Sequence, residues 1–560
     1  MPDYERWISD KTAEFHDLFT RMDTDEDLAV LKTYKMFDKD DRREPDVEEL
    51  TFNDPMVYAN RVESNLIKAH MQPDVRGVGL SDEDVAVIED FIKDYTLAID
   101  ESLVPRDIAS LMAFNVQQIC HRGRMITRST PSYKKGVFDP GVLPMDARYT
   151  LYEFGRKNLK AISYTRMRNK TQIESEYGAV IAEQMAGTEQ EVTDLWHEDK
   201  EIVYIGNVEA KNEKHGYDEL PFVIQVCPSG LMFRGQDMIA RSGESIFAPN
   251  RALYEPKNRL GSILMTLTIM SFMGGLQYES EQGIRAQKPE LPPYGKRKVA
   301  PIDKGTRGYF NMPINDVKEA TKNLIGMVIS NIQDGSLPPV SFGNIQFPMS
   351  GAGIESLKEA EDPIYLPRLE ALARYYQRFY RLIIQQYIDL GLNIKLGGLG
   401  NSTQYNYTDL DKDYNIMFRF FATSPKQNMV NISTAAAYGD SVSEDFKRRE
   451  VLQLENPDAE EAKIWAEKAP FMSPAVAKYK VIEGLLARGK LIEANLMAEE
   501  LGLTIDQIMS GNMGEQKEVE VPNRPIKQLM PLIAGKVGAG EREEKSPEPA
   551  SETTTEEVAV

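Results

Sequence analysis

The sequence is poor in the residues that build metal centres and disulfide frameworks. Its 560 residues include two cysteines, Cys120 and Cys227, and five histidines. Two cysteines are too few for a disulfide scaffold or a structural zinc site. We therefore expect no metal and no cofactor. The N-terminal residues also lack the basic and apolar pattern of a secretory signal, so we expect the chain to stay in the cytoplasm.

Basic residues are fewer than acidic ones: the sequence has 66 Lys and Arg and 87 Asp and Glu, which gives a net charge of −21. This balance argues against a surface that grips nucleic acid tightly, because such binding needs clustered Lys and Arg. The acidity is concentrated in residues 22–49, with eleven acids and five bases, and in residues 541–560, with seven acids and two bases. Two stretches are basic instead, residues 156–170 and 285–307, and a solvated face is the simplest interpretation of either.

Long hydrophobic runs are nearly absent. Residues 260–278 carry no charge and approach the length of about 20 residues that a membrane-spanning helix needs. Small residues interrupt this stretch at Gly261, Thr266, Ser271, Gly274 and Gly275. Because small residues let helices approach closely, in lipid or between subunits, we expect a closely packed helix rather than a membrane span.

Motifs of common enzymes are missing as well. No Gly-Lys pair is followed by the Ser or Thr of a phosphate-binding Walker loop. His197-Glu198 lacks the second histidine of a zinc protease, and residues 23–34 lack the glycine and glutamate of a calcium loop. We therefore expect no catalytic residues. The alternative is a soluble multidomain hydrolase, since a paired-carboxylate site has no recognisable spacing in so acidic a chain.

Residue periodicity predicts a mainly helical α+β protein. Helices are expected within residues 4–130, notably at 85–97 and 109–119, and strands at 201–206 and 221–226 on either side of a polar turn region at 211–218. Further helices are expected at 316–333, 354–390, 444–454, 476–487 and 491–501, with a strand at 416–421. Residues beyond 514 are too polar to form a core.

A second uncharged stretch covers residues 335–354, in a chain that is 27% charged. Long loops of this kind are usually functional or disordered. This one is too apolar for a solvated linker, because it contains side chains such as Val340, Phe342 and Phe347.

The order of these features resembles the portal proteins of tailed bacteriophages, especially the siphovirus type. The resemblance is carried by Leu220-Pro-Phe-Val-Ile, by paired helices that flank a Pro/Gly-rich insertion, and by Leu337-Pro-Pro-Val-Ser-Phe-Gly with Met349-Ser-Gly-Ala-Gly-Ile and a long helix after them. Residues 442–467 continue it. The similarity covers about 300 of the 560 residues.

The resemblance implies a portal-type subunit with wing, stem, clip and crown that assembles into a ring, typically a dodecamer, at one capsid vertex. Double-stranded DNA would pass through the ring during packaging and ejection. The implied partners are further copies of the chain, this DNA, the terminase large subunit, the major capsid protein and the head–tail adaptor, with no membrane. The implied location is the virion, preceded by the host cytoplasm during assembly.

The resemblance also divides the chain. Residues 1–257 would form the wing, with a mixed α/β part at 148–228, and residues 258–280 and 316–336 would form the two stem helices. The clip would be residues 281–315, between the stem helices, and the tunnel loop would be residues 337–353. Residues 354–427 would form a long wing helix and a return strand, residues 428–512 the crown helices, and residues 513–560 a mostly disordered acidic tail. The five small residues of 260–278 would pack at the contacts between stem helices. The clip residues that would bind the docking partners are Lys296, Arg297, Lys298, Lys304 and Arg307.

The tunnel loop would present Val340, Phe342, Asn344, Gln346, Phe347 and Ser350 to the DNA channel. Each phosphate that a protein neutralises with Lys or Arg adds roughly −0.9 to the slope of log affinity against log salt concentration. An uncharged loop avoids this attraction. It therefore suits contact with DNA that has to slide.

Overall fold

The computed structural model describes the greater part of residues 3–472. The described residues are 3–44, 47–134, 136–179, 187–206, 208–229, 231, 237–273, 276–278, 309–311, 319–338, 342, 361–397, 402–421, 425–452, 454, 457–472, 478, 481–482 and 497–498. The chain divides into two compact units, Met1–Trp465 and Ala466–Val560. The described helices and strands belong to the first unit, apart from the C-terminal end of α15 (Pro457–Met472).

The N-terminal part is mainly helical, as predicted. It contains α1 (Asp3–Ala29), α2 (Asp54–Ile67), α3 (Asp82–Leu103) and α4 (Leu111–Gln117). Ser81 begins α3 with a capping box, in which its hydroxyl accepts from the Asp84 amide and its own amide donates to the Asp84 carboxylate. The chain after α4 widens into a π-helical turn, Gln118–Arg122. It ends at Gly123, whose φ of +69° suits glycine.

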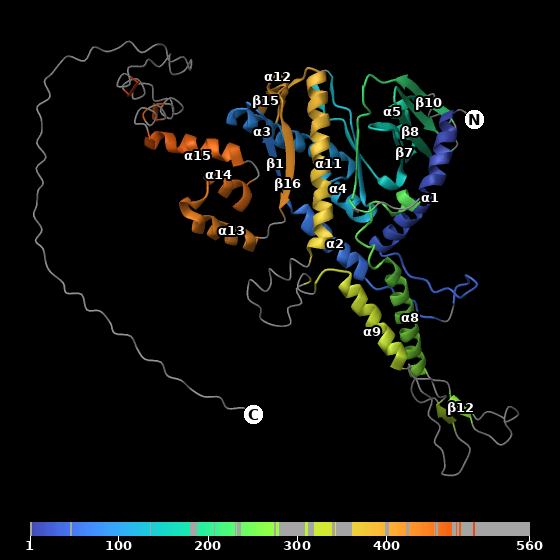
Figure 1. Ribbon diagram of the computed structural model, residues 1–560. Coiled ribbons are helices and arrows are strands. Elements are labelled where there is room, and N and C mark those ends of the chain that lie inside the picture. Colours follow the sequence, from blue (N-terminus) through green and yellow to red (C-terminus); the bar gives the residue numbers. More distant parts are fainter. Residues whose placement is uncertain are drawn as a thin grey trace, which may run out of the picture. The chain divides into compact units, whose positions relative to one another are not determined.

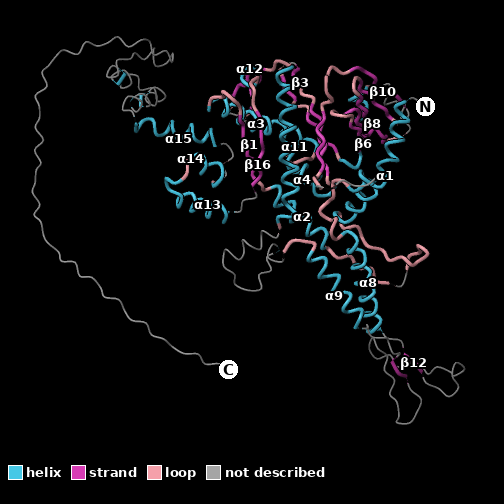
Figure 2. The backbone as a smooth tube through the Cα atoms, in the orientation of Figure 1, coloured by secondary structure: helices cyan, strands magenta, loops and turns pink. Residues whose placement is uncertain are grey.

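Two antiparallel sheets follow (Figure 2). The larger has the order β10-β9-β8-β7-β6, with β6 (Thr150–Phe154), β7 (Leu159–Asn169), β8 (Glu189–His197), β9 (Lys200–Ile205) and β10 (Val208–Lys214). The smaller has the order β11-β2-β5, with β2 (Arg124–Ser129), β5 (Val142–Met145) and β11 (Phe222–Val226). A short hairpin joins β3 (Ser132–Lys134) to β4 (Val137–Asp139), and α5 (Lys170–Tyr177) links β7 toward β8.

The strands predicted at 201–206 and 221–226 are confirmed as β9 and β11, but they belong to different sheets. The predicted polar turn at 211–218 is wrong for its first half, because Lys211–Lys214 continues β10, which pairs with β9. Strand β10 lies at the edge of the sheet and is largely solvent-exposed. An edge strand of this kind needs no hydrophobic alternation, so its sequence resembles that of a loop.

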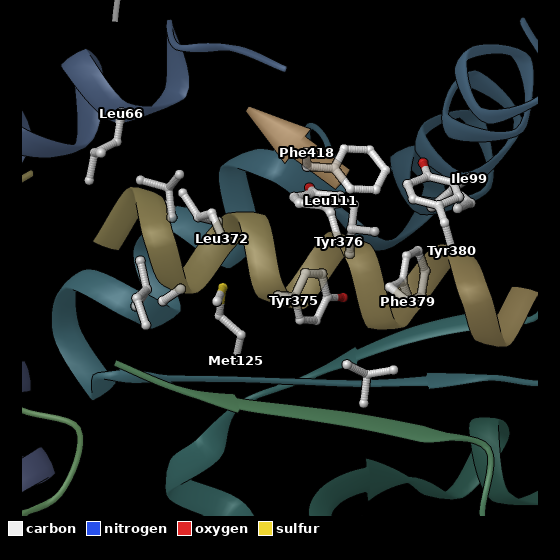
Figure 3. Close-up of a cluster of buried hydrophobic side chains, with 14 of the residues drawn as sticks. Leu66, Ile99, Leu111, Met125, Leu372, Tyr375, Tyr376, Phe379, Tyr380 and Phe418 are labelled. Atoms are coloured by element: carbon white, nitrogen blue, oxygen red, sulfur yellow. The ribbon is translucent and has the colours of Figure 1, made fainter. Parts of the chain in front are cut away.

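The main core forms around α11 (Asp362–Asp389). Its aromatic residues lie fully buried between α3, α4 and the strands (Figure 3), and they include Tyr375, Tyr376, Phe379 and Tyr380. Strand β1 (His70–Arg76) pairs antiparallel with β16 (Asn415–Phe421), so segments more than 300 residues apart join over this helix. Between α11 and β16 lie β14 (Asn393–Leu396), β15 (Thr403–Asn406) and α12 (Tyr407–Leu410).

The helix predicted at 354–390 is described from Asp362 onward, because residues 351–360 lie outside the described part. Pro363 occupies its first turn, where the missing N–H has no intrahelical partner to lose. Pro367 lies inside the helix.

Helices α7 (Asp237–Arg241) and α8 (Arg251–Met273) come next after β11. Strands β12 (Leu276–Tyr278) and β13 (Tyr309–Asn311) pair antiparallel, and α9 (Glu319–Asp334) follows. The last described elements are α13 (Pro425–Tyr438), α14 (Glu444–Phe446), a π-helical turn Lys447–Val451 and α15 (Pro457–Met472). The helix predicted at 444–454 therefore appears as α14 with the π-helical turn. The pair predicted at 476–487 and 491–501 lies almost entirely outside the described residues.

Candidate functional site: the α8–α9 helix pair and its attachments

Helices α8 and α9 pack side by side (Figure 1). They are joined through the antiparallel β12–β13 pair, whose register runs from Leu276↔Asn311 to Tyr278↔Tyr309. The chain therefore leaves along α8 and returns along α9, and residues 279–308, between β12 and β13 in the sequence, lie outside the described part. Helices are present within both predicted stretches, 258–280 and 316–336, but α8 begins earlier, at Arg251, and ends at Met273. The prediction of helix is wrong for Leu276–Tyr278, because these residues form strand β12 and pair with β13.

An extended segment, residues 48–52, runs along α8 and is hydrogen-bonded to it; we call it the strap. The backbone N–H groups of Glu48, Leu50 and Phe52 donate to side-chain oxygens of Thr266, Ser262 and Asn258, at 2.9, 2.9 and 3.0 Å. Two extended residues rise about 6.6 Å and four helical residues about 6.0 Å, so alternate strap amides match every fourth helix position.

The hydroxyls in this ladder each serve two partners. Ser262 Oγ donates to the Asn258 carbonyl and Thr266 Oγ1 donates to the Ser262 carbonyl, both at 2.8 Å, while each accepts a strap amide. Both side chains are buried, at 0% and 8% exposure. Each hydroxyl is therefore satisfied as donor and acceptor without water.

The small residues of α8 have a different neighbour from the one predicted. A β-carbon on Gly261 would lie 2.5 Å from Phe52 Cε2 and 3.2 Å from Leu50 Cδ2, so the missing side chain makes room for the strap. Thr266 accepts the Glu48 amide. Packing between subunits was the expectation for both residues, and the strap of the same chain covers them instead. Ser271 lies in α8 with its side chain outside the description, and Gly274 and Gly275 are not described.

A buried ion-pair network holds the first residue of α8. Arg251 forms a two-pronged contact with Asp25 of α1, at 2.6 and 2.9 Å, and also contacts Glu244 at 2.9 Å. Asp25 is 1% exposed. Burial by itself disfavours the charged guanidinium, but Asp25 and Glu244 outweigh it and raise the pKa of Arg251. The network therefore fixes the start of α8 to α1.

Other acids of α1 are also paired with bases of the same unit. Glu26 contacts Arg122 at 2.7 Å, and Asp23 contacts Arg148 at 2.5 Å. Part of the acidity of residues 22–49 is thus compensated within the fold. A charge sum along the sequence cannot show this, because the partners are distant in the chain.

The C-terminal end of α9 is attached to the start of α8. Asn250 Nδ2 donates to the Ile332 carbonyl at 2.9 Å, and Gly335 packs directly on the Asn250 side chain. Leu337 is fully buried in the main core, and Gln333 Nε2 donates to its carbonyl at 2.8 Å. The first residue of the predicted tunnel loop, Leu337, is therefore held in place by the main core and by Gln333 at the end of α9.

Of the predicted tunnel-loop residues, the structure describes Phe342, which is half-buried against the main core. Much of its ring is therefore covered by protein. Val340, Asn344, Gln346, Phe347 and Ser350 lie outside the described residues. The same holds for the predicted clip residues Lys296, Arg297, Lys298, Lys304 and Arg307.

Helix α9 carries apolar side chains on its exposed surface. Leu324 and Met327, one turn apart, are 49% and 60% exposed, and Ile329 is 49% exposed. Residues three positions apart share a helix face. Leu324 and Met327 therefore form a small apolar patch that the described part of the chain leaves uncovered.

The last helices are attached to the β1–β16 pair by charge. Asp74 of β1 is 3% exposed and is surrounded by Arg76, Arg419 and Arg449, at 2.8, 3.5 and 3.4 Å. Arg419 also pairs with Glu450. These contacts place the α14 region, predicted as part of a crown, next to the sheet that covers α11.

Both cysteines are buried and free. Burial raises the pKa of the Cys120 and Cys227 thiols, so neither is activated as a nucleophile. Within the described ranges, no helix is long and apolar enough to cross a membrane.

Comparison with known proteins finds no matching family model and no matching curated protein. Among solved structures, the chain is similar to one from the neck of an empty GTA particle computed with C6 symmetry. The two chains are 11% identical with a TM-score of 0.39, over 71% of this chain and 90% of the other. Likeness at this level carries no argument about function, which has to come from the residues of this chain.

Proposed function

We propose that the protein is a portal-type ring subunit with a structural rather than a catalytic role. In this proposal further copies of the chain form a ring, and double-stranded DNA passes through its channel during packaging and ejection. The ring docks the terminase and later the head–tail adaptor. The observation that carries the proposal is the α8–α9 helix pair, which is fixed at its base and is followed by the paired strands β12 and β13. In the sequence, the basic stretch 285–307 lies between these two strands.

The attachment of the helix pair supports this role. Arg251 ties the start of α8 to Asp25, the strap runs along one face of α8, and Asn250 holds the end of α9. A stem that transmits force between a motor and a capsid has to be joined firmly to its body. The contacts at the start of α8 and at the end of α9, together with the strap along one side of α8, meet that requirement.

The uncovered apolar patch of α9 supports assembly. The strap already occupies the Gly261 side of α8, so a neighbouring copy would meet another surface of the pair. Leu324 and Met327 are about half exposed. Complete burial of such a side chain contributes about 1.5 to 3 kcal/mol, so covering the exposed half contributes about 1 kcal/mol for each side chain and about 2 kcal/mol per interface. A closed ring repeats this gain at every interface.

The charge pattern supports a low-affinity channel. The stretch at 285–307 has seven bases and two acids, whereas residues 335–354 have no charge. A basic stretch suits docking to acidic partner surfaces, and an uncharged segment suits contact with sliding DNA.

Assembly is tested with the purified full-length protein by light scattering across a concentration series. We expect a mass of many subunits for the native chain. The double variant Leu324→Glu, Met327→Glu should shift it toward monomer, because two charges would have to be buried at each interface.

A matched control is Val78→Glu, Val104→Glu, which replaces two exposed valines away from the helix pair. This control should assemble as the native chain does. A native chain that remains a compact monomer at all concentrations would contradict the proposal.

The hydrolase alternative gains no specific support. In a cavity of about 830 Å³ between the five-stranded sheet and the β2–β5 region, two of the lining carboxylates are engaged in ion pairs. Asp194 contacts Arg128 and Glu201 contacts Lys211, both at 2.6 Å.

A further inference from the structure

A charged cavity lies between the five-stranded sheet and the β2–β5 region. Its volume is about 830 Å³, within the range of small-molecule sites. Strand β7 supplies Arg166 and Arg168, which lie two positions apart and therefore share one face of the sheet. The basic stretch at 156–170 thus contributes part of its charge to a cavity wall, and a solvated face is an incomplete interpretation of it.

The cavity has two ends that differ in charge balance. At one end, Arg128 pairs with Asp194 and Lys211 pairs with Glu201, each at 2.6 Å. These cations are neutralised by carboxylates. Glu213 also lies 3.6 Å from Lys211, so carboxylates outnumber cations here, although the buried Nε of Arg128 also lacks a hydrogen-bond partner.

At the other end cations outnumber carboxylates. Arg166 and Arg168 share one partner, Glu176, at 3.5 and 3.3 Å, and Glu176 is itself 37% exposed. Arg106 and Lys134 also line the cavity, and neither forms an ion pair within the described part of the chain. The four cations Arg106, Lys134, Arg166 and Arg168 are therefore balanced by two carboxylates of the lining, Glu176 and Asp139.

The guanidinium groups at this end have unused hydrogen-bonding capacity. The Nε atoms of Arg166 and Arg168 are buried and have no hydrogen-bond partner. Burial, together with the like charges of Arg166 and Arg106, lowers the pKa of Arg168. Buried donors without acceptors are costly, and arginine pairs are suited to two-pronged contacts with oxyanions.

We propose that this end of the cavity, formed by Arg106, Arg166 and Arg168, binds a small multivalent oxyanion of the phosphate type. The anion would accept from the buried Nε groups and neutralise the surplus charge. Its role is distinct from the proposed passage of DNA through the ring. A cavity of about 830 Å³ that is open to solvent on one side admits a free phosphate compound, and competition with a duplex tests whether a nucleic-acid backbone binds there instead.

The test is calorimetric titration of the full-length protein with pyrophosphate, at an ionic strength held constant with sodium chloride. We expect saturable binding by the native chain. The double variant Arg166→Gln, Arg168→Gln should bind at least about tenfold more weakly, because each charge-assisted hydrogen bond contributes enough for about a tenfold change. Arg106→Gln, which alters an exposed residue outside the sheets, should weaken binding as well and covers the case in which the double variant fails to fold.

The matched control is Arg156→Gln, Lys160→Gln, which removes two exposed charges of the same basic stretch that do not line the cavity. It should bind as the native chain does. Absence of saturation in the native chain, or equal weakening in the control, would overturn the proposal. Displacement of pyrophosphate by an equimolar duplex oligonucleotide would also overturn it, in favour of a nucleic-acid backbone.

Discussion

The strap on α8 can be tested by removing its two buried hydroxyl acceptors with the double variant Ser262→Ala, Thr266→Val. The Leu50 and Glu48 amides would lose their partners, which lie 2.9 Å away. A lost hydrogen bond of this kind costs about 1 kcal/mol, so the free energy of strap opening should fall by about 2 kcal/mol. That corresponds to roughly thirtyfold faster amide exchange.

Hydrogen–deuterium exchange of the peptide that covers residues 48–52 is the appropriate assay. Global unfolding would be ambiguous, because alanine raises helix propensity while the hydrogen bonds are lost. The Phe52 amide keeps its acceptor on Asn258 and reports whether the strap opens as a unit.

The control for the strap is Thr12→Val in α1, where an exposed threonine hydroxyl also donates to the carbonyl four residues earlier. It should leave exchange of residues 48–52 unchanged. If the double variant exchanges no faster than this control, the hydrogen-bond ladder does not hold the strap.

Three further predictions concern the body. Arg251→Gln should lower the free energy of unfolding by about 3 kcal/mol or more in urea titration, because the buried carboxylate of Asp25, 1% exposed, would lose its two-pronged partner. An unchanged unfolding midpoint would show that the Arg251–Asp25 ion pair does not stabilise the fold. Phe379→Ala should cost about 3 to 5 kcal/mol in the same assay, since the ring is fully buried beside Tyr375, and a loss under 1 kcal/mol would mean that the core around α11 is loose. The hydrogen bond from Trp7 lowers the pKa of Glu153. The ionised Glu153 carboxylate therefore stabilises the folded protein fully above the ordinary glutamate pKa, and this stabilisation disappears as pH falls through the lowered pKa. Melting temperatures of the native chain and Glu153→Gln should accordingly differ at pH 7 and converge at acidic pH, and a constant difference would refute this assignment.

Much of the local structure could be predicted from the sequence. Apolar residues at helical spacing located α3, and β-branched runs located β9 and β11. Strand β10 was missed because an exposed edge strand has the composition of a loop. Prediction was therefore best where one face of an element is buried and the other is solvated.

The long-range contacts could not be predicted in this way. The strap joins residues about 210 positions apart, and nothing in the local composition of 48–52 identifies its partner. The available signal was the set of small residues in the uncharged stretch 260–278. It indicated close packing correctly for Gly261 and Thr266, but not which segment packs there. The burial of Asp25 could not be predicted for the same reason, because its partner Arg251 is 226 residues away in the sequence.

The most direct test of the account is single-particle imaging of the purified full-length protein. The account predicts closed rings with a central channel, in which the α8–α9 pairs of neighbouring copies lie side by side. A population of single compact particles, or assemblies without a channel, would contradict it.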